Sequence, residues 1–421
     1  MKNCIIILFI SIGFITKLFA SGFQINEQGS RAMGLGGAFT GLSNDPSAIY
    51  FNPGGITQLP GTHLIAGATL ILPSSTFRGP FPSITESKMK SQVFYPIHFY
   101  ATHQLGEKLY LGLGVGNNYG LGTKWNPDWV GRYMAVETEI RTFFFNFVAS
   151  YKIMDEVSVG FGYVLAYGDV IIGRKLNLSP FNAESYLKLQ GDGYGSGFTA
   201  GLYVHPIRAI SLGVSFRSQV KIDFKGDATP SDYPSQFEGQ LPNGSITAPL
   251  TTPLNFTFGV AIMPNKNFTL SADYQYVGWD SYDKLEIQFK DFVDPSTQKP
   301  LISSSDRMYE NSFIARVGAE YKYSGHFTGR IGFLYDKNPV PDERLDPTLP
   351  DADRLGFNVG GSYKLSKNLS IEAAYMFLRF NEREITNSLE NYSGIDGSIS
   401  PMNGVYNSIA HLTSITLAYN F

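Results

Sequence analysis

Large apolar residues alternate with small or polar residues in several stretches of the chain. Between residues 157 and 168, valine, phenylalanine, leucine and tyrosine occupy every second position, and mostly small residues lie between them. The pattern recurs at 109–116, 254–263 and 369–377. Segments of about ten residues with this period are typical of a transmembrane β-barrel, in which one face meets lipid and the other the lumen. A water-soluble sandwich also alternates, so the pattern alone leaves both folds open.

The connections between these segments favour the barrel. Six short joins lie near residues 105–108, 154–156, 206–209, 264–267, 324–326 and 366–368. Seven longer polar or Pro/Gly-rich stretches lie near 73–90, 118–138, 175–195, 224–250, 281–309, 338–351 and 382–407. Bacterial barrels have short periplasmic turns and longer external loops, so this strict alternation predicts an all-β fold of fourteen antiparallel strands over residues 62–421. The even number places both ends of the barrel on the periplasmic side.

The two ends of the chain agree with an outer-membrane location. Lys2, the apolar run 5–15 and Ala20 form a signal peptide, residues 1–20, that contains the only cysteine, Cys4. An uncleaved anchor would need about 20 apolar residues, more than this run offers. The alternating last segment ends at Phe421, which resembles the signal read by the barrel assembly machinery. We therefore expect a multi-pass protein of the bacterial outer membrane.

Composition excludes several other classes of protein. The chain is 43 % hydrophobic and 14 % aromatic, too rich in both for a disordered protein. Its net charge of −3 and lack of a long basic run argue against nucleic acid as a partner. The six histidines are scattered, no H-E-x-x-H or G-x-S-x-G motif occurs, and we expect no metal, cofactor or enzymatic activity. An outer-membrane lipase remains an alternative, because a Ser/His pair needs only suitable geometry.

Residues 21–61 do not alternate. They contain many glycines and one helix start, where Asn44 or Asp45 would cap and Pro46 would occupy the first turn. A barrel of fourteen strands has a lumen too wide for side chains alone to fill. The segment is therefore expected to fold inward as a plug, and a periplasmic extension is the alternative.

Several motifs resemble the FadL/TodX family of outer-membrane transporters. They are SGFQINEQGSRAMGLGGAFTG from Ser21, the break at Asn52, Pro53 and Gly54, GLGTKW at 120–125, DWVGRY at 128–133 and LPDADR at 349–354. The resemblance implies a fourteen-stranded barrel with an N-terminal hatch that passes long-chain fatty acids or aromatic hydrocarbons. It assigns hatch gating to the Asn52 to Gly54 break, which usually reads Asn-Pro-Ala in the family. It also places Ser21, Gly22 and Phe23 in the ligand pocket.

The family's route implies a gap in the barrel wall at a kinked third strand, with release of the solute sideways into the membrane. In this sequence that strand covers about 109–117, and Gly112, Gly114 and Gly116 leave its inner face without bulk. The same glycines would equally make room for the plug.

The residues that hold a ligand are harder to select. A buried carboxylate needs a cation, and the candidates are Arg174, Arg217, Arg316 and Arg330. Each arginine could instead pair with a lumen carboxylate, for which Asp273, Glu320, Asp336 and Glu372 are available. Trp125, Trp129 and Tyr133 are candidates for the outer entrance region or for the interfacial aromatic girdle.

We therefore expect passive, hatch-gated diffusion of hydrophobic small molecules. The expected partners also include outer-membrane lipids and lipopolysaccharide. A non-specific porin and a loop-mediated adhesin or receptor are the alternatives. The natural substrate, the oligomeric state and the place of the lateral opening cannot be deduced from the sequence.

Overall fold

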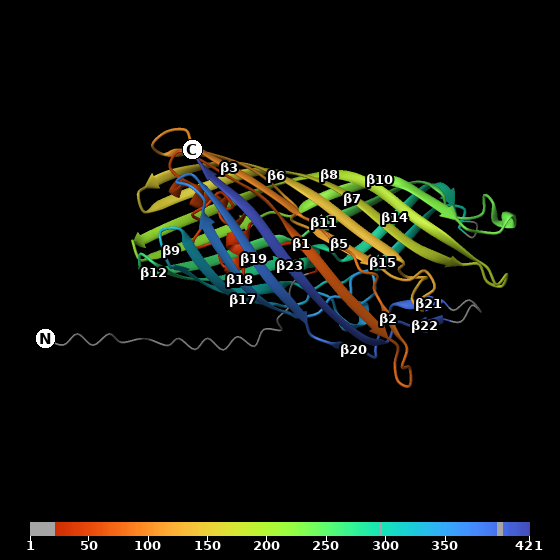
Figure 1. The fold of residues 1–421 in the computed structure, drawn as a ribbon. Coiled ribbons are helices and arrows are strands. Elements are labelled where there is room, and N and C mark those ends of the chain that lie inside the picture. Colours follow the sequence, from red (N-terminus) through yellow and green to blue (C-terminus); the bar gives the residue numbers. More distant parts are fainter. Residues whose placement is uncertain (1–21, 295–296, 394–398) are drawn as a thin grey trace.

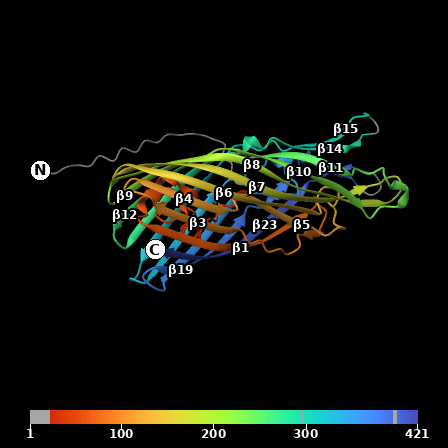
Figure 2. The ribbon, with the colours of Figure 1, turned by 90° about the horizontal axis from the view of Figure 1, so that it is seen from above.

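The computed structural model describes residues 22–294, 297–393 and 399–421. The expected signal peptide and Ser21 lie outside the described residues. Within them, no helix combines the length and the apolar character that crossing a membrane requires. The chain forms a closed antiparallel sheet around a short, partly helical segment from its start (Figure 1, Figure 2).

Fourteen antiparallel strands make the barrel in the described part of the chain, so the predicted fold class is confirmed. β1 pairs with β23 over nearly its whole length, which joins the first strand to the last and closes the barrel. Some barrel strands are interrupted and carry two labels. In order they are β1 (Thr62–Arg78), β2 (Glu86–Lys88) with β3 (Ile97–Gln104), β4 (Leu109–Gly116) with β5 (Gly120–Lys124), β6 (Glu137–Met154), β7 (Val157–Asn177), β8 (Glu184–Ile207), β9 (Ile210–Arg217) with β10 (Val220–Ser231), β11 (Gly244–Thr252) with β12 (Leu254–Asn265), β13 (Phe268–Gly278) with β14 (Lys284–Val293), β15 (Pro300–Asp306) with β16 (Ser312–Lys322), β17 (Phe327–Asp336), β18 (Arg354–Lys364), β19 (Leu369–Phe380) with β20 (Arg383–Ile385), and β23 (Gly404–Asn420).

The remaining secondary-structure elements are short and lie outside the barrel sheet. β21 (Asn391–Ser393) and β22 (Ile399–Pro401) pair only with each other. The short 3-10 helices η2 (Ser235–Phe237) and η4 (Asp342–Arg344) lie between barrel strands, and η3 (Trp279–Ser281) lies at the interruption between β13 and β14.

The period-two pattern separates the outside of the barrel from its lumen. On β23, Ile415 and Leu417 are 54 % and 49 % exposed, whereas Ser414 and Thr416 between them are fully buried. A strand that shows apolar residues outward and small polar residues inward suits a wall between lipid and a polar lumen. The apolar face of the strands therefore lies toward the membrane.

The short joins occur where the sequence predicts them, but several long connections are shorter than predicted. β7 and β8 continue as a hairpin, so only residues 178–183 remain of the loop expected at 175–195. β14 and β15 likewise occupy much of 281–309. These parts extend beyond the lipid, where a strand needs no apolar face. The alternation that identifies membrane strands is therefore lost in them. The long hairpins lie at the end of the barrel opposite the C-terminus (Figure 1).

Residues 22–61, called the hatch below, run through the lumen. They include α1 (Ser30–Gly34), α2 (Ala48–Phe51) and the 3-10 helix η1 (Pro53–Gln58). Ser30 Oγ hydrogen-bonds Ser414 Oγ of β23 at 2.9 Å, and Asn52 Nδ2 donates to Leu202 O of β8 at 3.0 Å. Because β8 and β23 lie on nearly opposite sides of the wall, the hatch spans the width of the barrel.

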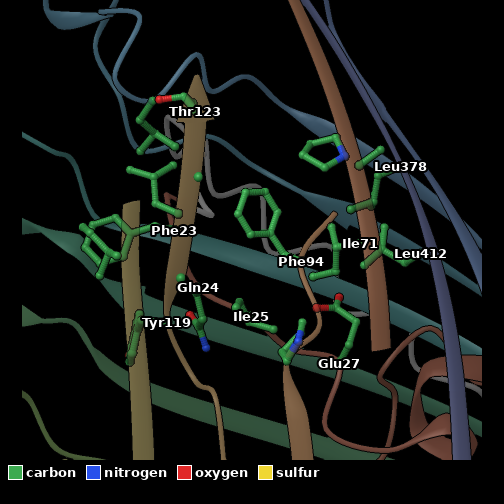
Figure 3. A pocket seen from close by; sticks show the side chains of 18 of the residues that line it. Phe23, Gln24, Ile25, Glu27, Ile71, Phe94, Tyr119, Thr123, Leu378 and Leu412 are labelled. Carbon is green, nitrogen blue, oxygen red and sulfur yellow. The ribbon is translucent and has the colours of Figure 1, made fainter. Parts of the chain in front are cut away.

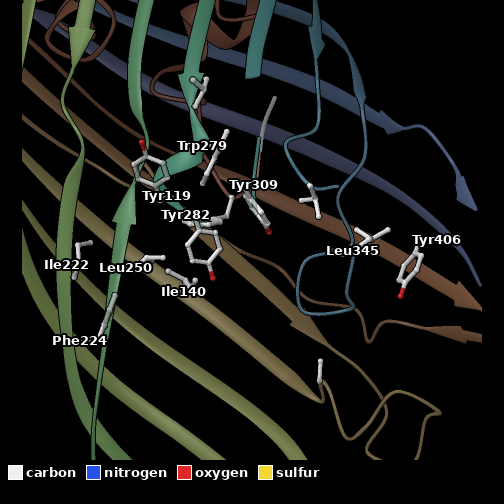
Figure 4. Close-up of a cluster of buried hydrophobic side chains, with 14 of the residues drawn as sticks. Tyr119, Ile140, Ile222, Phe224, Leu250, Trp279, Tyr282, Tyr309, Leu345 and Tyr406 are labelled. Carbon is white, nitrogen blue, oxygen red and sulfur yellow. The ribbon is translucent and has the colours of Figure 1, made fainter. Parts of the chain in front are cut away.

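Buried apolar side chains form four clusters in the described part of the chain, of which two are the largest. Around the hatch, Leu35, Phe39, Ile49 and Ile56 pack against wall residues that include Tyr100. Toward the loops, a larger core gathers aromatic rings from the hatch start, the strands and the loops, including Tyr119, Trp279, Tyr282 and Tyr309 (Figure 4). Phe23 and Tyr119 of the larger core also line the candidate functional site.

Candidate functional site

The hydrogen-bond ladder of the barrel is interrupted between the second and third strands. β3 pairs with β4 only as far as His98 opposite Gly116. Beyond that point β5 pairs with β6 alone, and the chain before β3 bonds to β1 through the Ile71–Phe94 bridge. The two strands meet again where Lys90 N donates to Lys124 O at 2.7 Å. Between these points the wall has a gap.

The start of the hatch lies along the inner side of this gap. Ile25 N donates to Asn118 O at 2.8 Å, and Gly120 N donates to Phe23 O at 2.9 Å. Gln24 forms an isolated antiparallel bridge with Tyr119. These bonds satisfy backbone groups where the third strand breaks, which matters because an unpaired backbone group is costly in a membrane wall.

A cavity of about 760 Å³ lies against the hatch start and the gap (Figure 3). Its lining comes from the hatch, from the interrupted second and third strands and from β1, β6, β16, β17, β18, β19 and β23, and it is mainly apolar. Among the lining side chains are Phe23, Ile25, Ile71, Phe94, Leu378 and Leu412. Val93 and Tyr95, which also line it, are 53 % and 70 % exposed on the outside of the barrel. The cavity therefore reaches from the lumen to the outer face of the wall.

Phe94 occupies the gap. Its ring lies against Gly122 so closely that a Cβ built on Gly122 would be 1.9 Å from Phe94 Cζ. The amide of Gln92 also reaches across, with Nε2 donating to Gly122 O at 3.4 Å. Nearer to β3, Ile97 N donates to Asn117 Oδ1 at 2.7 Å. The gap is thus filled by an aromatic side chain and bridged by side-chain hydrogen bonds, and not by a backbone ladder.

Phe23 lies in a cage of aromatic rings. The centre of its ring is 4.9 Å from that of Trp279, 5.7 Å from Tyr282 and 6.0 Å from Tyr119, all in edge-on orientations. Edge-to-face pairs of this kind contribute about 0.5–1.5 kcal/mol each beyond burial. The aromatic cage holds the beginning of the hatch beside the cavity.

Two charged residues hold the preceding backbone. Gly22 N donates to Asp351 Oδ2 at 3.0 Å, and Arg354 Nη2 donates to Gly22 O at 2.7 Å. Arg354 also pairs with Asp351 at 2.7 Å. The LPDADR motif therefore clamps the hatch start from more than 300 residues away in the chain.

The predicted pocket residues have different positions. Gly22 and Phe23 line the cavity, whereas Ser21 lies outside the described residues. Among the four candidate arginines only Arg316 lines it; its Nη1 donates to Gln275 Oε1 at 2.7 Å.

The other three arginines are turned to different neighbours. Arg330 pairs with Glu320 at 2.7 Å, in the lumen network that the sequence offered as the alternative. Arg217 stacks over the Tyr50 ring at 3.8 Å. Arg174 lies on β7, on the same face as Ile172 and Leu176, which pack on an apolar cluster of the outer hairpins. The sequence could place Arg217 and Arg330 on inward faces, and Arg174 where the fifth strand enters its loop, but it could not give their depth along the barrel.

The Asn52, Pro53 and Gly54 break lies away from the cavity. It packs against β6, β7 and β8, where Ser150 Oγ donates to Pro53 O at 2.7 Å. A Cβ on Gly54 would lie 3.0 Å from Gly201 O. Glycine in place of the family's alanine therefore fits this close approach.

The three glycines of β4 face the hatch. A Cβ on Gly112 or Gly114 would lie within 3 Å of Ile49, and one on Gly116 would lie 2.3 Å from Gln28 Oε1. They make room for the hatch, and the break in the third strand follows them directly at 117–119.

Trp125, Trp129 and Tyr133 are buried in the loops. The two indole rings stack at 4.5 Å, and Trp125 Nε1 donates to Pro347 O at 2.9 Å. Trp125 is fully buried and Trp129 is 5 % exposed, so these indoles face no lipid and form no part of an interfacial girdle. None of the three lines the cavity.

Several lining residues were not predicted from the sequence, notably Glu27, Phe94, Gly122 and Arg354. The glycines of GLGTKW and the charges of LPDADR were quoted only as family motifs, although a glycine pair in a strand is a sign of close approach. No cluster of metal ligands occurs among the residues that the structure describes.

These features define an outer-membrane β-barrel whose own N-terminal segment occupies the lumen beside an apolar cavity. The chain matches the outer membrane protein transport protein family (OMPP1/FadL/TodX) over residues 13–421, and it belongs to that family. The resemblance read from the sequence is thereby confirmed, as is the outer-membrane location.

Individual relatives are distant in sequence. The long-chain fatty acid transport protein of Salmonella typhi is 24 % identical, with 86 % of this chain and 88 % of the relative covered. A crystal structure of a Pseudomonas aeruginosa FadL homologue has a TM-score of 0.84 at 20 % identity and covers 95 % of this chain and 100 % of its own. The Ralstonia pickettii toluene transporter TbuX has a TM-score of 0.69 at 19 % identity, covering 96 % and 99 %. Such structural likeness establishes the fold.

Proposed function

We propose that this protein carries hydrophobic solutes, long-chain fatty acids or aromatic hydrocarbons, across the outer membrane by passive diffusion through the cavity. The observation that carries the proposal is the continuity of the cavity from the hatch start to the gap in the wall. Relatives that are named as transporters of fatty acids and of toluene support this range of substrates.

Release through the wall follows from the chemistry of the solute. Transfer of a hydrophobic molecule from an apolar cavity into water is unfavourable, whereas transfer into lipid keeps its surroundings apolar. The gap at Phe94 and Gly122 supplies such a path, since no backbone ladder crosses it between Lys90 and His98 in the described residues. Phe94 would act as the movable part of this exit.

Binding at the start of the hatch would couple the solute to the plug. Phe23 and Gly22 line the cavity and are held by aromatic contacts and by the Asp351–Arg354 pair. A solute that displaces Phe23 from its cage would loosen these residues. This role of the hatch, and the gating role of the Asn52 to Gly54 break, are parts of the proposal.

Uptake of labelled oleate and labelled toluene tests the proposal. We expect cells that lack the protein to take up at least one of the two solutes several-fold more slowly, and expression of the full chain to restore the rate. Unchanged uptake of both solutes would leave an adhesin or receptor as the better account. Steady ionic conductance of the purified protein in a planar bilayer would favour a porin.

A further inference from the structure

A second hollow lies on the outer face of the barrel, about half-way around the wall from the interrupted second and third strands. It has a volume of about 560 Å³, its surface is almost wholly apolar, and its lining comes from β12, β13, β16, β17 and β18. This hollow is called the wall groove below. The large side chains around it are Val260, Ile262, Leu270, Val317, Ile331 and Phe357.

The wall groove exists because two lipid-facing positions carry alanine. In the strand ladder, Ala272 lies between Val260 and Val317. Ala319 lies in the same way between large residues of β13 and β17. Short side chains between large ones leave a channel in the surface. Apolar association within lipid depends on close packing rather than on exclusion of water, so a channel of this kind favours a chain that can fill it.

The wall groove lies in the half of the membrane next to the short turns. Ile262, Leu270 and Ile331 are within about five residues of the turns that join β12 to β13 and β16 to β17. Between them and the turns, Tyr321 and Tyr363 are about half exposed on the outside of the barrel. Tyrosine is enriched at the boundary between membrane and water. Because the short turns of bacterial barrels are periplasmic, the wall groove opens to the periplasmic leaflet, which holds the phospholipids of an outer membrane.

The turns next to the wall groove carry only positive charge. Residues 264–268, 322–327 and 364–369 contain no aspartate or glutamate and four lysines, called the basic turns below: Lys266, Lys322, Lys364 and Lys367. All four are exposed, and none of them forms an ion pair in the part of the chain that the structure describes. The carboxylate of Glu320, two residues from Lys322, is buried and pairs with Arg330. The basic turns are therefore free to bind an anion.

The other short turns at this end of the barrel carry both signs of charge. In and beside 105–108, 154–156 and 206–209, the charged residues are Glu107, Lys108, Lys152, Asp155, Glu156 and Arg208. The excess of positive charge is thus confined to the side of the wall groove.

We propose that the wall groove binds an acyl chain of an anionic phospholipid from the periplasmic leaflet, and that the basic turns bind its phosphate headgroup. A flexible apolar chain fills the channel over the two alanines. Lysines near a membrane surface attract anionic lipids, and an ammonium group donates strong hydrogen bonds to phosphate. The inference concerns the outer surface of the barrel and does not rest on the proposed function.

A second copy of the chain fits this surface less well than a phospholipid does. Two copies related by a two-fold axis would place one hollow against another and leave space between them, whereas stable apolar contacts are closely packed. The same arrangement would also bring the two sets of basic turns together, and like charges repel. A phospholipid supplies both a chain that fills the hollow and a charge of the opposite sign.

Binding of palmitoyl-oleoyl phosphatidylglycerol and of the matching phosphatidylethanolamine, measured by native mass spectrometry of the purified mature full-length protein, tests the charged part of the inference. We expect the phosphatidylglycerol to bind at least five-fold more tightly. The triple variant Lys266→Gln, Lys322→Gln and Lys364→Gln should bring the two affinities within two-fold of each other. The matched control replaces Lys108, Lys152 and Arg208 by Gln, and it should keep the wild-type preference to within two-fold.

Filling the hollow tests the apolar part. Ala319→Phe should weaken binding of both lipids at least five-fold, because the ring occupies the space of the acyl chain. Ala149→Phe makes the same change at an exposed position of β6, away from the wall groove, and should alter neither affinity by more than two-fold. Heat-modifiable migration during electrophoresis shows that each variant is folded.

Three results would overturn the inference. The first is equal affinity of the wild type for the two lipids, and the second is a preference that the triple lysine variant retains. The third is a stable dimer of the wild type that Ala319→Phe dissociates, which would assign the wall groove to a second copy of the chain. The lysine variant changes only exposed side chains at the turns, so the test stands even if Ala319→Phe fails to assemble.

Discussion

The barrel wall is continuous on one side and interrupted on the other. β6 pairs with β7 without a break from Glu137 opposite Gly173 to Lys152 opposite Ser158. β7 pairs with β8 along its whole length, 157–177. The second and third strands lose their ladder beyond His98, although the same period of two runs through them. An unbroken ladder satisfies every backbone group and seals the wall. In the interrupted wall, the hatch satisfies part of the backbone, so the opening depends on a segment that is not itself a barrel strand.

Removal of the hatch should have the largest effect on the interrupted side of the barrel. Deletion of residues 24–50 would remove the hydrogen bond between Ile25 and Asn118 and empty the lumen of the barrel. We expect ionic conductance in planar bilayers to rise more than ten-fold, and uptake of hydrophobic solutes to fall to the level of cells without the protein. Unchanged uptake would mean that the solute does not use the cavity beside the hatch.

Closing the gap should have the next largest effect. Gly122→Leu places side-chain atoms where the Phe94 ring lies, since even a Cβ would be 1.9 Å from Phe94 Cζ. We expect solute uptake to fall about ten-fold while the barrel still folds. Gly106→Leu is the control, because a side chain at Gly106 meets nothing within 4 Å. If Gly122→Leu transports normally in a folded barrel, the solute leaves by another route.

Weakening the contacts that hold the hatch start should have a milder effect than closing the gap. Asp351→Ala removes the acceptor for Gly22 N and the partner of Arg354, and hydrogen bonds to charged groups contribute about 1.5–3 kcal/mol. We expect a lower unfolding temperature and more frequent conductance spikes. Asp342→Ala removes an exposed carboxylate partner of Arg383 and should cost at most about 1 kcal/mol. Equal effects of the two variants would argue that the clamp is no stronger than a surface pair.

Glu27→Gln should make the stability of the interrupted side less dependent on pH. Burial raises the pKa of Glu27 above its ordinary value of 4.5, so the folded protein holds the proton at pH values where the unfolded chain has lost it. The contribution of Glu27 to stability therefore falls as pH rises through this window. We expect Glu27→Gln to raise the unfolding temperature by a few degrees at pH 8 and to change it little at pH 4. A decrease at pH 8 would contradict this account.

The smallest effect is expected on the continuous side. Arg141 on β6 pairs with Asp169 on β7 at 2.7 Å, and its side chain is 57 % exposed. Exposed pairs of this kind contribute about 0–1 kcal/mol. Arg141→Gln should therefore leave the unfolding temperature within about two degrees of the wild type. A larger loss would indicate that this wall depends on side-chain pairs as well as on its ladder.

Sequence reasoning succeeded where the physical cause is local. Alternation along residues 157–168 depends on neighbours two positions apart, so the pattern predicts the outward and inward faces of β7 correctly. It failed for the outer hairpins, because strands in water need no apolar face. It also predicted loops over residues that form β14 and β15.

The site is less predictable because its residues come from distant parts of the chain. Arg316 and Arg330 are both inward-facing in sequence terms, yet only Arg316 lines the cavity, because depth in the lumen depends on where the hatch packs. Glu27 gave no sign of its position, since an acidic residue near a chain start is ordinarily solvated.

The sequence by itself determined that this chain makes a membrane barrel of fourteen strands with a non-alternating segment at its start, because the period of two and the lengths of turns are written locally. Only the tertiary structure decided where the wall opens and which groups meet there. A missing ladder is a relation between two strands, and the clamp of Gly22 by Asp351 joins residues more than 300 positions apart. Neither has a local pattern, so each becomes visible only when the barrel closes around the hatch.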